Sequence, residues 1–170
     1  MTDPIDGVPH TLRTEREDDQ PAIDALHDEV FGPGRFARSA FRLREGVAHD
    51  RSLSLVAEIG GRLVGSVILT PIMAGGRPAL LLGPLAVATE WSGRGIGKSL
   101  VRGALAAARD AGHAVVLLVG DEPYYGPLGF VRLAIGALKM PAPVDPNRIL
   151  VAALRPGALE GLAGAVTPAR

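Results

Sequence analysis

The chain has 170 residues, which suits one domain with its own hydrophobic core and leaves no room for a second. Its 18 lysines and arginines balance its 18 aspartates and glutamates, so it has no basic field that would attract nucleic acid or anionic lipid. The absence of cysteine excludes disulfides, thiolate metal sites and a cysteinyl acyl-enzyme.

The N-terminal residues predict a flexible tail over 1–9, followed by a single domain over 10–170. This start has neither the basic residues nor the apolar stretch of a secretory signal, and no run reaches the ~20 apolar residues that span a bilayer. We therefore expect a cytoplasmic protein, a monomer or a homodimer, with no membrane or nucleic-acid partner.

The first predicted helix covers the run 15–32, where apolar residues recur along one face and a glycine ends the pattern. Asp18 or Asp19 can cap its start, and the acidic residues of this run complement the helix dipole. A second helix is expected over 38–45.

A β-hairpin follows, because two β-rich runs at 52–59 and 62–70 flank Gly60 and Gly61, which tolerate the positive φ angles of tight turns. The stretch 71–78 is expected to be irregular. The apolar run 79–87 predicts the next strand, and the Gly83-Pro84 pair within it indicates a bulge, a bend or an edge.

The segment 96–111 has the periodicity of a helix and ends at Gly112, and the apolar run 114–119 predicts a buried strand. Together with the strand at 79–87 these elements have the spacing of a parallel crossover. The remainder predicts a turn-rich piece, then short strands near 130–133 and 148–154, and a glycine-rich C-terminus.

The loop of this crossover, SGRGIGKS, carries glycines at alternate positions just before a helix start. Such glycines let the backbone approach an anion, and the free N–H groups of the first helical turn point toward it. We therefore predict a phosphate site, to which these residues contribute: Ser92, Gly93, Arg94, Gly95, Ile96, Gly97, Lys98 and Ser99.

Two other phosphate motifs compete for the loop. A dinucleotide fingerprint fails, because no G-x-G-x-x-G begins at Gly93 or Gly95. A Walker A loop is missed by one residue, since Ser92 stands where its first glycine belongs, and Asp121 imitates the end of a Walker B strand. A nucleotide hydrolase therefore stays open, although such folds normally begin with the loop.

The stretch LGPLAVATEWSGRGIGKSLV resembles motif A of the GNAT N-acetyltransferase superfamily, with Gly95 and Gly97 at its glycines and Ser92 where glutamine or arginine is usual. GDEPYYGPLGF is similar to motif B, with Tyr125 five residues before Phe130. The resemblance covers roughly 12–162 and is closest to a bacterial branch of small acetyltransferases. It implies an α/β fold with a mixed, mostly antiparallel central sheet that splays between its fourth and fifth strands and is flanked by helices.

The resemblance further implies an acetyl-coenzyme A dependent enzyme without a metal, in which an amine attacks the thioester directly in a ternary complex. The cofactor's pantetheine arm would bind along Leu85, Ala86 and Val87, with the Leu85 N–H at the thioester oxygen. Tyr125 would protonate the departing thiolate. The candidate general bases are Glu58 and Glu122.

Plainer interpretations of these residues stay open. Tyr125 can be a packed aromatic, Tyr124 is expected to be structural, and Glu58 is expected on the solvated side of a strand. The four histidines have no metal-binding spacing and are expected at the surface or on helix faces. The acceptor, a small-molecule or protein amine, is not specified, and a non-catalytic acyl-coenzyme A sensor on the same fold is a third possible function.

Overall fold

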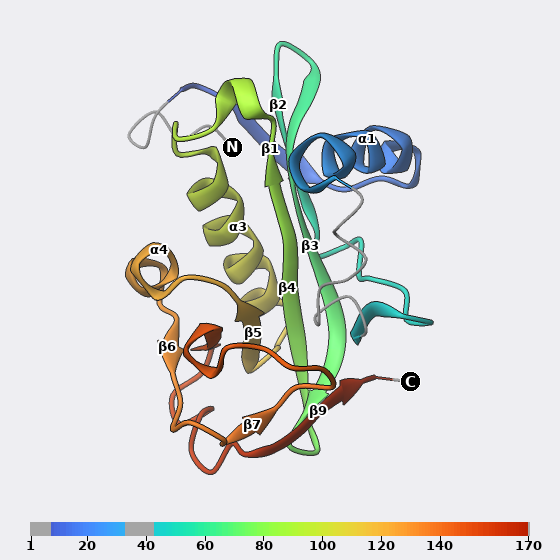
Figure 1. Cartoon of the computed structure of the whole chain (residues 1–170). Helices are drawn as coiled ribbons and strands as arrows, with labels where there is room; N and C mark the ends of the chain where they lie inside the picture. Colours follow the sequence, from blue (N-terminus) through green and yellow to red (C-terminus); the bar gives the residue numbers. More distant parts are fainter. Residues whose placement is uncertain (1–7, 33–42, 170) are drawn as a thin grey trace.

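The computed structural model of the chain describes residues 8–32 and 43–169 (Figure 1). The strands and helices, in chain order, are β1 (Thr11–Thr14), α1 (Gln20–Phe31), β2 (Leu55–Ile59), β3 (Arg62–Ala74), β4 (Arg77–Val87), α3 (Ile96–Asp110), β5 (Val115–Val119), α4 (Glu122–Tyr125), β6 (Val131–Arg132), β7 (Leu138–Lys139), β8 (Ile149–Ala153) and β9 (Gly164–Pro168). None of the helices in these two described stretches is both long and apolar enough to cross a bilayer.

A mixed sheet in the order β1-β2-β3-β4-β5-β8-β6 forms the centre of the molecule. Only β4 and β5 pair in parallel along this path, and every other neighbour is antiparallel. Helices α3 and α1 lie on opposite sides of the sheet (Figure 1). The predicted α/β fold with a mostly antiparallel sheet is confirmed.

Helix α3 supplies most of the core on its side of the sheet. Its apolar face, including Leu100, Val101 and Ala104, is buried against β2, β3 and β4. Gly112 follows the helix at a φ of 91°, as expected of a glycine that ends a helix. The strand, loop, helix and strand of the predicted crossover are therefore all present.

The hairpin of β2 and β3 is confirmed, but the expectation of an irregular stretch at 71–78 is wrong. Strand β3 continues to Ala74, turns at Gly75 and Gly76 and pairs with β4 along its length. Pro71 is tolerated because β2 pairs with β3 only up to Val67 and β9 begins only at Ile72. The proline therefore stands where β3 has a strand partner on one side only.

Helix α1 begins at Gln20 after a short 3-10 turn, and Gly32 follows it at a φ of 64°. The expected side-chain cap is not made by Asp19. Its carboxylate instead accepts hydrogen bonds from the Arg16 N–H at 2.7 Å and from the Arg13 guanidinium at 2.8 Å. The helix expected over 38–45 lies largely outside the described residues.

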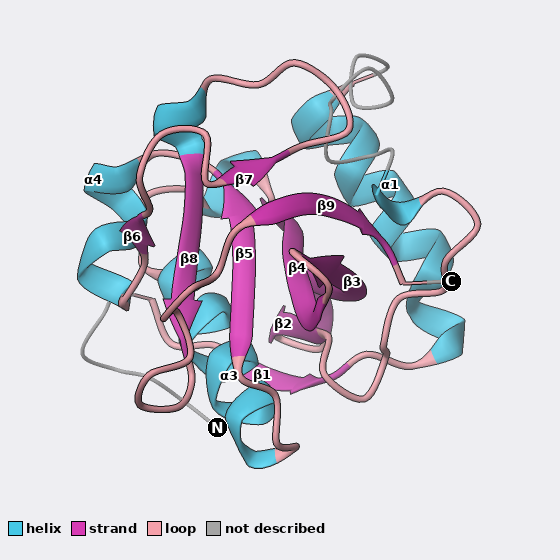
Figure 2. Ribbon diagram, turned by 90° about the horizontal axis from the view of Figure 1, so that it is seen from below, coloured by secondary structure: helices cyan, strands magenta, loops and turns pink. Residues whose placement is uncertain are grey.

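The two short strands β7 and β9, near the C-terminus, were not predicted. Strand β9 pairs with β3 and with β7 (Figure 2), and its Val166 is buried. Helix α4 is a single turn that continues into a 3-10 turn containing Pro127, as the proline and glycines of this segment suggested.

Candidate functional site

Strands β4 and β5 separate after a short stretch of pairing. Their register includes only Leu80 with Val116 and Leu81 with Leu117. Opposite β3, strand β4 has one extra residue between Leu82 and Leu85, which places a bulge at Gly83-Pro84. The predicted break is confirmed, and the end of β4 leaves a gap on the side of β5.

Beyond the bulge, the direction of the backbone groups follows from one hydrogen bond. The Ala88 N–H donates to the Val64 carbonyl of β3 at 2.8 Å. Because N–H groups alternate between the two edges of a strand, Ala86 also faces β3, whereas Leu85 and Val87 face the gap. Of the three β4 residues predicted to bind a cofactor, Leu85 and Val87 therefore direct their backbone N–H groups into the gap.

The loop before α3 presents a second set of amides. Within the described part of the chain, no hydrogen bond engages the backbone N–H groups from Gly93 to Lys98. Gly95 precedes the helix at a φ of 86° and provides no side-chain cap. The 15-residue helix adds the positive end of its dipole, and two basic side chains, those of Arg94 and Lys98, flank the amides.

The loop and the end of β4 meet at Gly97. A Cβ added there would lie 3.7 Å from the Val87 side chain and 3.8 Å from that of Leu85. The same position is 2.6 Å from the Tyr124 hydroxyl, and Lys98 Nζ lies 5.7 Å from the Tyr124 ring centroid. The absence of a side chain at Gly97 thus leaves room where loop, strand and α4 converge.

The two tyrosines of α4 have different surroundings. The ring of Tyr125 packs edge-on against Tyr124 and Phe130, with centroids 4.7 and 5.8 Å away, and closely approaches Gly120. Burial raises the pKa of Tyr125 to about 12, with a further increase from Tyr124 and Asp121. Burial also raises the pKa of Tyr124. Both hydroxyls are therefore protonated at neutral pH and can act as proton donors.

Three other predicted site residues are engaged locally. The Ser92 hydroxyl donates to the Thr89 carbonyl at 2.9 Å, and the Arg94 guanidinium lies 5.2 Å from the Trp91 ring centroid. Ser99 is buried in the first turn of α3, and its Oγ lies 2.9 Å from His10 Nε2. His10 is only 3% exposed and directly precedes β1, so the expectation that this histidine lies at the surface or on a helix face is wrong.

The structure does not bring Glu58 to Leu85. Glu58 pairs in register with Leu63, whereas Leu85 pairs with Val67 further along β3. The Glu58 carboxylate accepts a hydrogen bond from Arg13 Nε at 2.9 Å. Glu122 lies on α4 beside the tyrosines and forms an ion pair with Arg132 at 3.2 Å.

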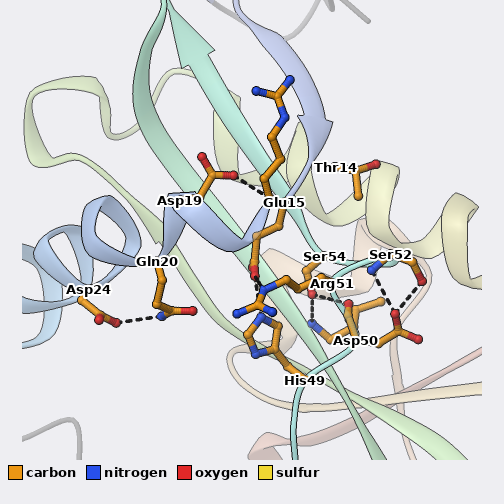
Figure 3. A network of polar contacts seen from close by, with 12 residues as sticks. Thr14, Glu15, Asp19, Gln20, Asp24, His49, Asp50, Arg51, Ser52 and Ser54 are labelled. Carbon is orange, nitrogen blue, oxygen red and sulfur yellow. Dashed lines mark hydrogen bonds and ion pairs between the residues drawn. The ribbon is translucent and has the colours of Figure 1, made fainter.

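The acidic residue Glu15 belongs to a buried network that the sequence did not predict (Figure 3). Its side chain is 0% exposed, and Oε2 lies 2.6 Å from His49 Nε2 and 3.1 Å from Arg51 Nε. Oε1 has no partner in the described part of the chain. The interpretation of Glu15 as part of an acidic helix start is therefore wrong, because the helix begins later and Glu15 turns into the protein.

The geometry weighs against the Walker A interpretation of the loop. A Walker serine must offer its hydroxyl to Mg²⁺, but the Ser99 hydroxyl is buried and hydrogen-bonded to His10. The sheet is also mostly antiparallel. Among the described residues, no group of three or more His, Asp or Glu side chains is arranged to hold a metal ion.

Comparison with known proteins identifies relatives over most of the chain. Residues 14–130 match the model of the acetyltransferase (GNAT) family. The uncharacterised N-acetyltransferase YhbS of Escherichia coli K12 is 32% identical over 158 residues, covering 91% of this chain and 93% of YhbS.

Two solved structures extend this comparison. The crystal structure of E. coli YhbS in complex with CoA superposes with a TM-score of 0.80 at 31% identity, covering 99% of this chain and 93% of that one. A GNAT acetyltransferase from Brucella melitensis in complex with acetyl-CoA has a TM-score of 0.65 at 29% identity, covering 86% and 89% of the two chains.

Proposed function

Because this chain belongs to the acetyltransferase (GNAT) family, we propose that it transfers an acetyl group from acetyl-coenzyme A to a primary amine by direct attack in a ternary complex. Two of its structural relatives carry CoA or acetyl-CoA, which supports a coenzyme A thioester as the donor here. The acceptor is a small-molecule or a protein amine.

The amides from Gly93 to Lys98 have no hydrogen-bond partner among the described residues, and this is the observation that carries the proposal. In a folded protein, such N–H groups at a helix start are satisfied by water or by a ligand. A diphosphate offers several anionic oxygens to the same helix end and gains from its dipole. We therefore place the diphosphate of the cofactor at this loop, with Arg94 and Lys98 beside it.

From this loop the pantetheine arm runs along the free edge of β4. Leu85 and Val87 face the gap left by β5, so their N–H and C=O groups are free to pair with the amides of the arm. The thioester then lies beside the Leu85 N–H, next to the bulge. The site residues brought together in this way are Leu85, Val87, Gly97 and Tyr124.

The reaction forms a C–N bond to the acetyl carbon and breaks its C–S bond. Attack of the neutral amine gives a tetrahedral oxyanion, which the Leu85 N–H stabilises. On collapse, the thiolate leaves and takes a proton from the Tyr125 hydroxyl, which is neutral because burial raises its pKa to about 12. The attacking nitrogen, which carries a positive charge after the attack, releases one proton to solvent, and Tyr125 regains its proton from solvent, so that the products are the neutral amide and the free thiol.

An ammonium acceptor must first lose a proton to a base or to a chain of waters. Of the two candidate carboxylates, Glu58 is held by Arg13 at 2.9 Å and lies away from the Leu85 row of the sheet. Glu122 shares α4 with the tyrosines, and its partner Arg132 is 46% exposed. The geometry therefore favours Glu122 over Glu58 as the base.

Thermal unfolding tests the donor assignment. A ligand that binds only the folded state raises the unfolding temperature, so a hundredfold excess of CoA over its Kd stabilises the protein by about 2.7 kcal/mol. We expect CoA to raise the Tm and ATP with Mg²⁺ to leave it unchanged. A shift with ATP and none with CoA would instead support a nucleotide hydrolase.

A further inference from the structure

The N-terminal segment Val8–His10 is attached to the loop proposed to bind the diphosphate. The Val8 N–H donates to the Arg94 carbonyl at 3.3 Å. His10 Nε2 lies 2.9 Å from Ser99 Oγ, and His10 Nδ1 lies 2.8 Å from the Val8 carbonyl oxygen. Two residues distant in sequence from the loop thus contact it at Arg94 and at Ser99.

The chemistry of the partners fixes the direction of these hydrogen bonds. A carbonyl oxygen only accepts, so His10 Nδ1 carries the proton that it shares with Val8. In the neutral ring Nε2 is then an acceptor, and the Ser99 hydroxyl donates its proton to it. Because His10 and Ser99 are only 3% and 4% exposed, water does not compete strongly for this bond.

The two contacts bracket the amides that are proposed to hold the diphosphate. Gly95, Ile96, Gly97 and Lys98 lie between Arg94 and Ser99, and no side chain of residues 8–32 or 43–169 caps the start of α3. Gly93 and Gly95 have φ angles of 72° and 86°, and glycines give the loop wide conformational freedom. Ordering such a loop when the ligand binds costs free energy and weakens the affinity. Contacts from another segment that hold the loop in its binding conformation beforehand would reduce this cost.

We propose that His10 is a positioning residue for the diphosphate site, and that its hydrogen bond with Ser99 holds the loop amides in the arrangement that binds the cofactor. This inference rests on the proposed function, because the ligand is the diphosphate of coenzyme A. His10 does not touch the ligand. It acts through Ser99 and Val8, which fix the two ends of the amide row.

Replacing His10 by Leu removes both hydrogen bonds while retaining a side chain that fills the buried space. We expect the Kd for CoA, measured by calorimetry, to rise at least tenfold. His10→Gln, whose amide can donate to Val8 and accept from Ser99, is expected to recover most of the affinity. His113 is a partly exposed histidine after α3, and His113→Gln serves as the matched control. This variant should bind CoA as the wild type does.

A second readout separates positioning from a general folding defect. S-acetylpantetheine carries the thioester but no diphosphate, so its use does not depend on the loop amides. The ratio of kcat/KM for acetyl-CoA to that for S-acetylpantetheine should fall about tenfold in His10→Leu and in Ser99→Ala. The double variant should be no worse than His10→Leu alone, because the bond that Ser99→Ala removes is already lost in His10→Leu.

The inference is overturned if the His10→Leu variant loses the same fraction of its kcat/KM with acetyl-CoA and with S-acetylpantetheine. It is also overturned if the Kd of this variant for CoA equals that of the wild type. Should His10→Leu fail to fold, Ser99→Ala provides the same comparison, since it removes only a hydroxyl from a helix. A wild-type protein that binds no CoA would instead contradict the proposed function itself.

Discussion

Tyr125 and Tyr124 are adjacent in sequence but contact different parts of the site. Tyr125 packs against Phe130 and Gly120, whereas the Tyr124 hydroxyl lies at Gly97 on the loop. The sequence motif predicted Tyr125 as the general acid and Tyr124 as a structural residue. The contact of Tyr124 with Gly97 depends on how the short α4 turn lies against the start of α3, and no residue pattern predicted that arrangement.

The substitution Tyr125→Phe removes the proposed proton donor and little of the packing area. We expect kcat to fall about a hundredfold, within the range of general acid catalysis, with little change in the KM for acetyl-CoA. Tyr124→Phe should mainly change the KM for acetyl-CoA. Steady-state kinetics with a responsive amine decide between them, and the reverse pattern would assign the acid to Tyr124.

A buried carboxylate is a second feature that depends on single residues. Glu15 is held by His49 and Arg51, and Glu15→Ala would remove the acceptor that these two side chains share. We expect the free energy of unfolding to fall by about 2–3 kcal/mol, because two charge-assisted bonds and a buried side chain are lost. Asp18→Ala, an exposed neighbour in the same acidic run, should cost about 0.5 kcal/mol or less.

Urea denaturation of the two variants measures the difference. Equal stabilities would show that the Glu15 network contributes nothing net, as many ion pairs do. Glu15 illustrates what sequence reading missed: a run of charges does not reveal which member turns inward. The alternation of β1 gave no signal of this, because it places position 15 on the side of Arg13, opposite the buried Leu12.

At the scale of elements, local patterns predicted the longest segments well. The apolar periodicity of α3 and the glycine turn between β2 and β3 defined their boundaries to within a few residues. The strands β7 and β9 were missed because they are short and form only by pairing with distant partners. The continuation of β3 past Pro71 was missed because it requires knowing which edge of the strand lacks a neighbour.

The loop between β4 and α3 allows a test of backbone geometry. Gly93 has a φ of 72° with open space around its Cβ position, so Gly93→Ala introduces backbone strain without a clash. The strain costs about 1–2 kcal/mol, which the loop can relieve by turning its amides away from the diphosphate. We expect CoA to bind at least fivefold more weakly.

Gly76→Ala is the matched control, because Gly76 has a φ of 79° and equally open surroundings in the turn between β3 and β4. Its loss of stability should be similar, and its affinity for CoA should equal that of the wild type. Calorimetric titration of both variants measures this. Equal affinities for Gly93→Ala and Gly76→Ala would show that the loop does not bind the diphosphate.

Across the whole molecule, the long hairpin of β3 and β4 connects two regions with different tasks. Its turn end pairs with β9 at Ile72–Ala74, where Val166 is buried. Its other end carries Leu85 and Val87 beside the loop. Stability at the turn end and cofactor binding at the far end should therefore be separable.

The substitution Val166→Ala tests this separation by removing two buried methyl groups at the turn end. The free energy of unfolding should fall by about 1.5–3 kcal/mol from lost burial and a residual cavity. The Kd for CoA should stay within twofold of the wild type, because β9 pairs with β3 at Ile72–Ala74 and with β7, at the other end of the hairpin from Leu85 and Val87. If affinity and stability fall together, the sheet transmits strain between its ends and the site depends on the packing of β9.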